Sequence, residues 1–500
     1  MTNKIYYGDN LEILRNQIAT ESVDLCYIDP PFNSKRNYNQ IYNNIGAEKE
    51  DAAQAQAFID TWTWDSAAEQ GLREIINNSN QVLTVQSIKL IIGLEQILGK
   101  GELLAYLVSM TLRIGEIHRV LKTTGSFYLH CDTTASHYLK LILDGVFCAR
   151  GGEFQNEIAW CYGSGGASKR HFSKKHDVIF FYTKSDDYTF NVDAVREPYS
   201  SPHKSMTPKV VGDKSYLKMN PLGRIPFDWW QIPILTNSAK ERLGYPTQKP
   251  EALLEKIIKA SSNEGDVVLD AYCGCGTTVA VAHRLNRKWI GIDITYQSIS
   301  LILKRLQHSF AKDFAASVLD KNNPNSALEI NGVPKDFESA VALANKHDDR
   351  TRKEFEKWAV LSYSNNRAVI NEKKGGDGGI DGIAFVDDSV DKANRVIKKV
   401  IFSVKSNQKL SPAVVRDLNG TIERENAVMG ILLTLYSMDN LVKECKKYGE
   451  VKLAGNFYPK IEVVSIEEMF QGKYLKLPNT IEVLKKAEQK AEQKSLLEIE

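Results

Sequence analysis

The 500-residue chain has no apolar run that approaches the roughly 20 residues a membrane-spanning helix requires. Its first residues, Met1 to Lys4, lack the apolar core of a signal peptide. It has only seven cysteines, and none of their spacings is typical of a metal site. These absences argue against a membrane-spanning or secreted protein, and they predict a cytoplasmic chain with reduced thiols.

An excess of charge of one sign is also missing. The formal net charge is only +2, so the chain as a whole carries no basic signature for nucleic acid, and any such signature must be local. Hydrophobic residues make up 43% and charged residues 25%, which is ordinary globular composition with ample material for buried cores. A chain of this length predicts about three domains.

The first informative stretch is Tyr27-Ile28-Asp29-Pro30-Pro31-Phe32. The hydrophobic run 23–28 predicts a buried strand, and it ends at an acid, two prolines and an aromatic residue. Because proline cannot continue a central strand, the chain must leave the sheet there. Asp29 and Phe32 are then presented at the carboxyl end of a strand, where open α/β sheets bind their ligands.

These residue types suit the binding of a planar base through its exocyclic amine. The carboxylate of Asp29 and the carbonyl of Pro30 can each accept one N–H, which aims the nitrogen lone pair at an electrophile. Phe32 can stack on the base. The alternative interpretation of this stretch is a strand-ending turn with an acid that caps a helix.

Periodicity along the first half predicts an α/β fold with a parallel sheet. A strand at 4–7, a helix from residue 11 and the strand 23–28 form a β-α-β opening, and a mobile loop is expected at 33–56. Residues 58–64 are aromatic and contain tryptophan, and this composition favours packing against the core over contact with a base. His130 and His137 are candidates for a catalytic role, but structural histidines are the commoner case, and a structural role is expected for both. The further expected elements are helices at 85–98, 103–121 and 137–147 and a strand at 125–132.

Residues 161–250 differ in composition from the rest of the chain. They hold 14 Lys and Arg against 8 Asp and Glu, with aromatic residues and glycine or proline turns interleaved. A basic, aromatic, loop-rich insert is what combined phosphate and base contacts require. The alternative is a surface subdomain without a ligand.

A second motif follows this basic region. Thr247-Gln248-Lys249-Pro250 precedes a helix, and the strand 267–269 ends at Asp270. A turn with two glycines, Gly274 and Gly276, then leads into another helix. This arrangement binds ligands in Rossmann-like sheets. The turn has only two glycines and opens with an acid, which suits a cofactor with an amino acid end better than a pyrophosphate; the alternative is a structural turn. Asp293 ends the next strand, where an acid commonly holds ribose hydroxyls. Together these residues predict an S-adenosylmethionine (AdoMet) site.

The order of these motifs resembles the β group of amino-methylating DNA methyltransferases. That group includes N6-adenine methylases and the modification subunits of type III restriction systems. The resemblance covers roughly residues 1–310 and rests on Asp-Pro-Pro-Phe first, a basic insert next, and the glycine loop last. It departs from the family at Ala271, where proline is common, and at Tyr272, where phenylalanine is usual.

The resemblance implies an AdoMet-dependent methyltransferase fold that flips its target base out of double-stranded DNA. An aspartate before the two prolines favours adenine over cytosine in that family. The implied catalytic element is Asp29, Pro30, Pro31 and Phe32, and the implied cofactor residues are Asp9, Lys249, Asp270, Tyr272, Gly274, Gly276, Thr277 and Asp293.

The C-terminal third predicts a second α/β unit. A glycine-rich turn at 375–382 contains Asp381 and leads into the strand 383–386, and a strand at 396–405 ends at Lys405. An acid and a lysine on partner strands can hold a divalent metal and orient water for phosphodiester attack.

This unit resembles PD-(D/E)xK nucleases, in particular Mrr-like restriction domains. The resemblance implies Asp381 as a Mg²⁺ ligand, Lys405 beside the attacking water, and Glu356 as an acid on a helix. Ser403 stands where the family has Glu or Gln, which removes a metal ligand. The alternative is a glycine hairpin in a DNA-binding module that does not cleave.

The expected organisation is therefore a Rossmann-like α/β methyltransferase with an inserted target-recognition domain, followed by an α/β restriction-endonuclease-like domain. The boundaries are 1–160 for the first methyltransferase part, 161–245 for a target-recognition insert, 246–310 for the AdoMet-binding part, 311–340 for a linker, 341–472 for the restriction-endonuclease-like domain and 473–500 for a charged helical tail.

The leading function is site-specific DNA methylation, with adenine N6 as the expected target, in a restriction–modification setting. A cytosine-N4 enzyme whose C-terminal domain only binds DNA is the closest alternative. A methyltransferase of RNA or protein, or a DNA-binding defence protein with degenerate sites, fits the motifs less well. A homodimer and a restriction-system partner are both compatible with the sequence, and no pattern in it indicates the recognition sequence.

Overall fold

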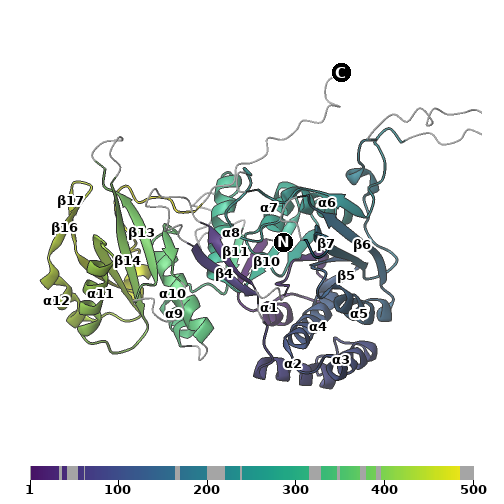
Figure 1. The fold of residues 1–500 in the computed structure, drawn as a ribbon, viewed down its shortest axis with the longest axis horizontal. Coiled ribbons are helices and arrows are strands. Elements are labelled where there is room, and N and C mark those ends of the chain that lie inside the picture. The colour runs from purple at the N-terminus through teal and green to yellow at the C-terminus, as the bar shows by residue number, and fades with distance from the viewer. Residues whose placement is uncertain are drawn as a thin grey trace, which may run out of the picture. The chain divides into compact units, whose positions relative to one another are not determined.

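A computed structural model describes residues 2–32, 36–41, 54–60, 62–163, 169–199, 220–236, 239–314, 328–345, 349–371, 379–389 and 396–484. The chain forms two compact units (Figure 1). The first unit comprises Met1–Arg36, Asp60–Leu235 and Lys249–Ile292, and the second comprises Asn37–Ile59, Thr236–Gln248 and Asp293–Glu500.

The first unit alternates strands and helices, as the periodicity predicts. Its strands are β1 (Asn3–Tyr7), β2 (Val23–Ile28), β5 (Leu121–Cys131), β6 (Glu153–Cys161), β7 (His176–Thr183), β8 (Trp229–Gln231), β9 (Val267–Asp270) and β10 (Lys288–Asp293). Its helices are α1 (Asn10–Gln17), α2 (Ser66–Asn77), α3 (Val85–Leu98), α4 (Glu102–Val120), α5 (Ser136–Val146), α6 (Glu251–Ser261) and α7 (Thr277–Arg284), with 3-10 turns η1 (Cys148–Arg150) and η2 (Val192–Val195).

The strands of this unit follow the order β1-β10-β9-β2-β5-β7-β6-β8. β2 is parallel to both β9 and β5, with Cys26 opposite Leu269 on one side and Phe127 on the other. β7 is antiparallel to β5 and to β6. The predicted parallel sheet is therefore confirmed for its centre, and its far edge is mixed.

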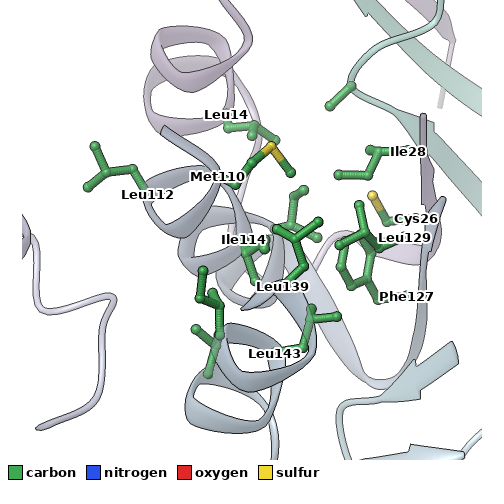
Figure 2. Close-up of a cluster of buried hydrophobic side chains, with 14 of the residues drawn as sticks. Leu14, Cys26, Ile28, Met110, Leu112, Ile114, Phe127, Leu129, Leu139 and Leu143 are labelled. Atoms are coloured by element: carbon green, nitrogen blue, oxygen red, sulfur yellow. The ribbon is translucent and has the colours of Figure 1, made fainter. Parts of the chain in front are cut away.

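The unit has three layers, with the sheet between two layers of helices. Side chains of β5 show this, because successive side chains of a strand point to opposite faces of the sheet. Phe127 and Leu129 pack into the main core with Leu139 and Leu143 of α5 (Figure 2). On the other face, the hydroxyl of Tyr128 lies 2.8 Å from that of Ser261 at the end of α6. Helices α4 and α5 thus lie against one face of the sheet and α6 against the other (Figure 1).

The main core explains why the helices form where the sequence predicts them. Leu14 of α1, Met110 and Ile114 of α4, and Cys26 and Ile28 of β2 meet in it and are almost completely buried (Figure 2). Burial of such side chains stabilises each by about 1.5–3 kcal/mol. The expected packing anchor also lies here, since Trp62 and Trp64 pack against the same core.

Two expected segments contain more regular structure than the sequence suggested. The range 33–56, expected as a loop, includes β3 (Arg36–Ile41) and the first residues of β4 (Gln54–Asp60), and these two strands pair with each other. The expected insert 161–245 includes β7, which pairs with β5 inside the central sheet. The reason is that β7 is a run of buried aromatic and β-branched residues, so it covers sheet surface that would otherwise be exposed.

The second unit contains a five-stranded sheet of order β12-β13-β14-β15-β18. Its strands are β11 (Leu328–Asn331), β12 (Ala368–Ile370), β13 (Gly382–Asp387), β14 (Ile397–Lys405), β15 (Met429–Thr434), β16 (Glu450–Leu453), β17 (Asn456–Pro459) and β18 (Ile461–Ser465). Its helices are α8 (Tyr296–Ser309), α9 (Phe337–Ala344), α10 (Asp349–Tyr363), α11 (Ala413–Arg424), α12 (Asp439–Cys445) and α13 (Ile466–Phe470), with the 3-10 turn η4 (Lys446–Tyr448).

The predicted linker and tail also contain ordered parts. β11 and the start of α9 fall within 311–340. Leu477 and Val483 are buried, and the amide of Ile481 donates to the carbonyl of Phe385, so residues up to 484 pack onto the second unit. The charged helix expected at 487–494 lies outside the described residues. Within the part of the chain that the structure describes, no helix is both long and apolar enough to span a bilayer.

His118 in the last turn of α4 makes the stability of the first unit depend on pH. Its ring packs edge-on against Phe147, and the Arg150 guanidinium donates to its Nδ1 atom. Burial, helped by the charges of Arg150 and Lys184, lowers the pKa of His118 from 6.5 to about 3. Because the unfolded chain binds this proton more readily, stability is complete above the unfolded pKa and falls as pH drops below it.

We expect His118→Gln, which cannot ionise, to reduce this acid sensitivity. Between about pH 7.5 and about pH 5 the unmodified chain should lose about 2 kcal/mol more stability than the variant. Calorimetric unfolding of both proteins at the two pH values measures the difference. An identical pH dependence would contradict the low pKa of His118.

Candidate active sites

Asp29 and Phe32 lie just beyond the end of β2, where the prolines take the chain out of the sheet. Lys249 donates a hydrogen bond to the Oδ2 atom of Asp29. The Oδ1 atom of Asp29 is 3.8 Å from Nδ1 of His130, which is completely buried. The Phe32 ring packs on the core and lies 5.6 Å from the His130 ring. A carboxylate and an aromatic ring thus face the same small region, as the sequence predicts.

The glycine loop follows the neighbouring strand β9. Asp270, which is only 4% exposed, accepts a hydrogen bond from the amide of Tyr272 and one of 2.5 Å from the Thr278 hydroxyl. Gly274 and Gly276 have φ angles of +47° and +73°, in the left-handed region that favours glycine. Asp270 therefore closes the loop on itself, and Gly276 directs the chain into α7.

The glycine loop lies close to β10. The amide of Cys273 donates to the carbonyl of Ile292, and a Cβ atom on Gly291 would lie 3.1 Å from Val279 and 3.3 Å from the Cys273 sulfur. A side chain at position 291 would require the Val279 and Cys273 side chains to shift by a few tenths of an ångström. Glycine at this position allows the loop and the start of α7 to pack closely on β10.

A polar network connects the end of β1 with the same loop. Arg113 of α4 donates to the carboxylate of Asp9 at 3.0 Å and to Oδ1 of Asn10 at 2.6 Å. The side-chain amide of Asn10 donates to the carbonyl of Ala271 at 2.8 Å. Burial raises the pKa of Tyr272, opposed by Arg113 and Asn10, so its hydroxyl stays protonated. Asp9 and the glycine loop are thereby held at one edge of the sheet.

Two predicted cofactor residues have contacts that the sequence did not indicate. Asp293, the last residue of β10, accepts hydrogen bonds from the amide and the hydroxyl of Thr295. Lys249 lies against Asp29 and 5.6 Å from the centre of the Phe32 ring. The assignments of Lys249 to a cofactor carboxylate and of Asp293 to ribose hydroxyls stay predictions.

The residues around the loop have the chemistry that AdoMet requires. Asp9 offers a carboxylate that is 42% exposed, Tyr272 offers a partly buried ring, and Thr277 begins α7, whose N-terminus presents backbone amide donors. Carboxylates suit an ammonium and ribose hydroxyls, and amide donors suit a carboxylate. The donor set therefore fits the cofactor that the sequence predicts.

The second candidate site lies in the sheet of the second unit. Asp381 directly precedes β13, and its Oδ2 atom accepts a hydrogen bond of 2.6 Å from the amide of Val404 on the partner strand β14. Lys405 ends β14 and donates to the hydroxyl of Ser403 at 3.1 Å. The acid and the lysine thus occupy adjacent strands, as the sequence predicts. Residues 375–378 of the glycine-rich turn lie outside the described part of the chain.

Glu356 on α10 interacts electrostatically with Asp381 and Lys405. Burial and the nearby Asp381 carboxylate raise its pKa to about 7, against the opposing charge of Lys405. Two carboxyls near one lysine can share a divalent cation. Among the described residues, however, no cluster of three or more His, Cys, Asp or Glu side chains has metal-binding geometry. Ser403 supplies a hydroxyl where a third carboxylate would complete such a set.

Several polar residues of the first site were not predicted from the sequence. Asp177 is a charged residue at the start of the buried strand β7, and Arg113 is an arginine inside an apolar helix. A charge in such a position is a signal of a buried partner. The sequence predicts a structural role for His130, and the structure places this histidine beside Asp29.

The comparisons with known proteins agree with this architecture. Residues 23–304 match the family model of DNA methylases. The chain therefore belongs to the DNA methylase family. Residues 348–456 match a restriction endonuclease model, which confirms the prediction of a methylase joined to a restriction-endonuclease-like domain.

Individual relatives cover mainly the first part of the chain. The DNA adenine methyltransferase YhdJ of Escherichia coli (strain K12) is 31% identical over 321 residues, which are 63% of this chain and 86% of YhdJ. The Type II methyltransferase M.HpaI of Haemophilus parainfluenzae is 37% identical over 39% of this chain and 57% of its own length. The crystal structure of the M1.HpyAVI–SAM complex covers 61% of this chain and 98% of its own, at 19% identity and a TM-score of 0.33.

We expect Asp293→Ala to weaken AdoMet binding about 10- to 100-fold, because hydrogen bonds to a charged acceptor contribute roughly 1.5–3 kcal/mol. Titration calorimetry of the full chain with AdoMet measures the affinity. Asp293→Asn serves as the control for the turn, since its amide oxygen can still accept from Thr295. An unchanged affinity in the alanine variant would contradict the ribose role.

Proposed function

We propose that the first unit methylates the N6 amine of adenine in double-stranded DNA at a specific sequence. The observation that carries this proposal is the pairing of β2 with β9. Leu25 and Cys26 lie opposite Val268 and Leu269 in parallel register, so Asp29 and the glycine loop follow adjacent strands at the same edge of the sheet. An amine held by Asp29 would then lie next to a cofactor held by the loop.

The catalytic element would act by hydrogen bonding and stacking. Asp29 Oδ2 and the carbonyl of Pro30 accept the two amine hydrogens of a flipped base, and Phe32 packs against the base ring. AdoMet, when bound, supplies a methyl group already activated by its sulfonium. Asp29 and the carbonyl of Pro30 would keep the nitrogen lone pair directed at that methyl group, and the proton that the amine loses on transfer would be released to water.

The contact between Lys249 and Asp29 supports this role for the carboxylate. An ammonium N–H already donates to Oδ2, which is the atom proposed to accept the amine. The lysine is therefore a stand-in for the substrate donor, and it must move aside when the base enters. Its side chain is only 11% exposed, so this movement takes place within the site.

Adenine is favoured over cytosine by two observations. The relative YhdJ is named as an adenine methyltransferase. An aspartate precedes the two prolines of the catalytic element, which is typical of adenine enzymes in the family that the motifs resemble. The second candidate is a cytosine-N4 enzyme. A methyltransferase of either kind would act in the cytoplasm, alone, as a homodimer or with a restriction-system partner.

We expect Asp29→Ala to lower methyl transfer to DNA by at least about a hundredfold, because it removes the acceptor at the reacting amine. AdoMet binding should be retained. Transfer of a labelled methyl group to DNA measures the rate, and mass spectrometry of the nucleosides identifies the base. Asp24→Asn is the matched control, since Asp24 lies at the other end of β2 and pairs with Lys122. Near-normal turnover by Asp29→Ala, or N4-methylcytosine as the product, would overturn the corresponding part of the proposal.

We propose that residues 161–245 select the methylated sequence. Their excess of positive charge and their aromatic residues suit phosphate and base contacts. Since β7 is part of the central sheet, the variable part is expected to lie between 184 and 228.

Exchange of residues 184–228 for the matching segment of a relative with another specificity should move the methylated site. Single-molecule sequencing of DNA from cells that express the chimera reads the new sequence. Retention of the original site would assign recognition to another part of the chain.

We propose that the second unit cleaves DNA weakly in the presence of Mg²⁺. Asp381 and Glu356 would hold the metal, which keeps several waters in most protein sites, and Lys405 would lie near the attacking water. The Ser403 hydroxyl is a poorer ligand than a carboxylate, which explains why weak activity is expected. Cleavage should be restricted to one methylation state, because an unrestricted nuclease would damage the host genome.

Asp381→Ala and Lys405→Ala should abolish this cleavage, whereas Lys398→Ala, at the other end of β14, should not. Ser403→Glu restores a third carboxylate and should raise the rate by about tenfold or more. The assay compares methylated and unmethylated DNA with Mg²⁺ or EDTA. If no protein cuts DNA, the unit is better described as a DNA-binding module.

A further inference from the structure

His130 is a completely buried histidine whose two ring nitrogens face different carboxylates. Its Nε2 atom lies 3.2 Å from Oδ2 of Asp177, and its Nδ1 atom lies 3.8 Å from Oδ1 of Asp29 and 3.0 Å from the hydroxyl of Tyr27. The Trp160 ring packs edge-on against it at 5.4 Å. A histidine that only fills the core does not need acidic partners on both sides.

The register of the sheet explains how these residues meet. Ile28 of β2 lies opposite Leu129 of β5, so Asp29 and His130 are the next neighbours at the ends of these strands. His130 lies opposite Ile179 of β7, and Asp177, two residues away, points to the same face. Three strands therefore contribute one residue each to a row at the carboxyl end of the sheet.

The contacts beyond His130 fix the plane of its ring. The Asp177 carboxylate also accepts a hydrogen bond of 3.0 Å from Tyr162. Although burial opposes ionisation, the hydrogen bond and charge of His130 and the charge of Lys249 lower the pKa of Asp177. An ionised carboxylate can only accept, so the Nε2 atom of His130 carries a proton directed at Asp177. The Nδ1 edge is then directed at Tyr27 and Asp29.

The two oxygens of Asp29 consequently have different surroundings. Oδ1 faces His130, and Oδ2 faces Lys249, which marks the position proposed for the amine. The same imidazole lies beside Phe32, the proposed stacking ring. Rotation of the His130 ring would change the surroundings of both side chains that are proposed to hold the base.

We propose that His130 is a positioning residue, anchored by Asp177, that sets the orientation of Asp29 and Phe32 for methyl transfer. This inference rests on the proposed function of the first unit. Misplacement of a reacting group by about 1 Å can cost on the order of a hundredfold in rate. His130 would therefore affect the chemical step through Asp29 and Phe32.

Two conservative substitutions test the contacts on the two sides of the His130 ring separately. In His130→Gln the side-chain amide nitrogen can still reach Asp177 but the Nδ1 edge is lost. In His130→Asn the acceptor near Tyr27 is kept but the anchor to Asp177 is lost.

His118→Gln is the matched control, because His118 is also buried beside a phenylalanine ring but lies in α4, with Arg150 as its hydrogen-bond partner. Asp29→Ala tests the underlying function.

The experiment measures single-turnover methyl transfer by the full chain with saturating DNA and AdoMet, together with the KM for DNA, the AdoMet affinity and the thermal midpoint. Both His130 variants should lower the single-turnover rate about 10- to 100-fold. Their KM for DNA and their AdoMet affinity should stay at the unmodified values. His118→Gln should change only the thermal midpoint, and Asp177→Asn should lower the rate in the same direction as the His130 variants.

An unchanged rate in both His130 variants, with a fall in thermal midpoint like that of His118→Gln, would overturn the proposal and make His130 a core residue only. A loss of rate that follows a loss of AdoMet affinity would also overturn it, because the histidine would then belong to the cofactor pocket. If the unmodified chain transfers no methyl group, or Asp29→Ala is as active as the unmodified chain, the proposed function fails and this inference fails with it.

Discussion

The pairing of β2 with its two parallel neighbours is the constraint on which the methylase unit depends. Parallel strands end at the same edge of a sheet, so whatever follows β2, β5 and β9 must meet there. The prolines after Asp29 stop β2, and the carboxylate of Asp270 folds the loop after β9 back on itself. A slip of β2 by one residue would turn Asp29 to the opposite face of the sheet, away from His130 and Lys249. In the observed register Cys26 and Ile28 pack into the main core (Figure 2).

The regular elements could be predicted because local patterns determine them. The strand 23–28 and the helix 85–98 match the observed elements residue for residue, since each is bounded by a clear stop signal. The motif residues Asp29 and Asp270 were also located correctly at strand ends. The place of β7 in the sheet could not be predicted, because it depends on antiparallel pairing with β5, which lies far from it in the sequence. Hydrophobic alternation predicts a strand and does not identify its partner.

The side-chain contacts within the site could not be predicted from the sequence, for a related reason. Lys249 is separated from Asp29 by most of the first unit, and Asp177 lies on a different strand from His130. Only the completed sheet brings them together. A charged residue inside a buried segment indicates that a partner exists, as Asp177 illustrates, but the identity of that partner is a tertiary property.

The contact between Lys249 and Asp29 has an electrostatic reason that connects stability with function. Asp29 is only 15% exposed, and an unpaired carboxylate in such a position would cost several kcal/mol, on the order of the penalty for a buried charge. The lysine offsets that cost. In the role proposed for Asp29, a neutral base amine would replace this charged partner, and the exchange would be more favourable with another positive charge near the carboxylate. The sulfonium of AdoMet, when bound, would supply such a charge, so base entry would be more favourable with the methyl donor already in place.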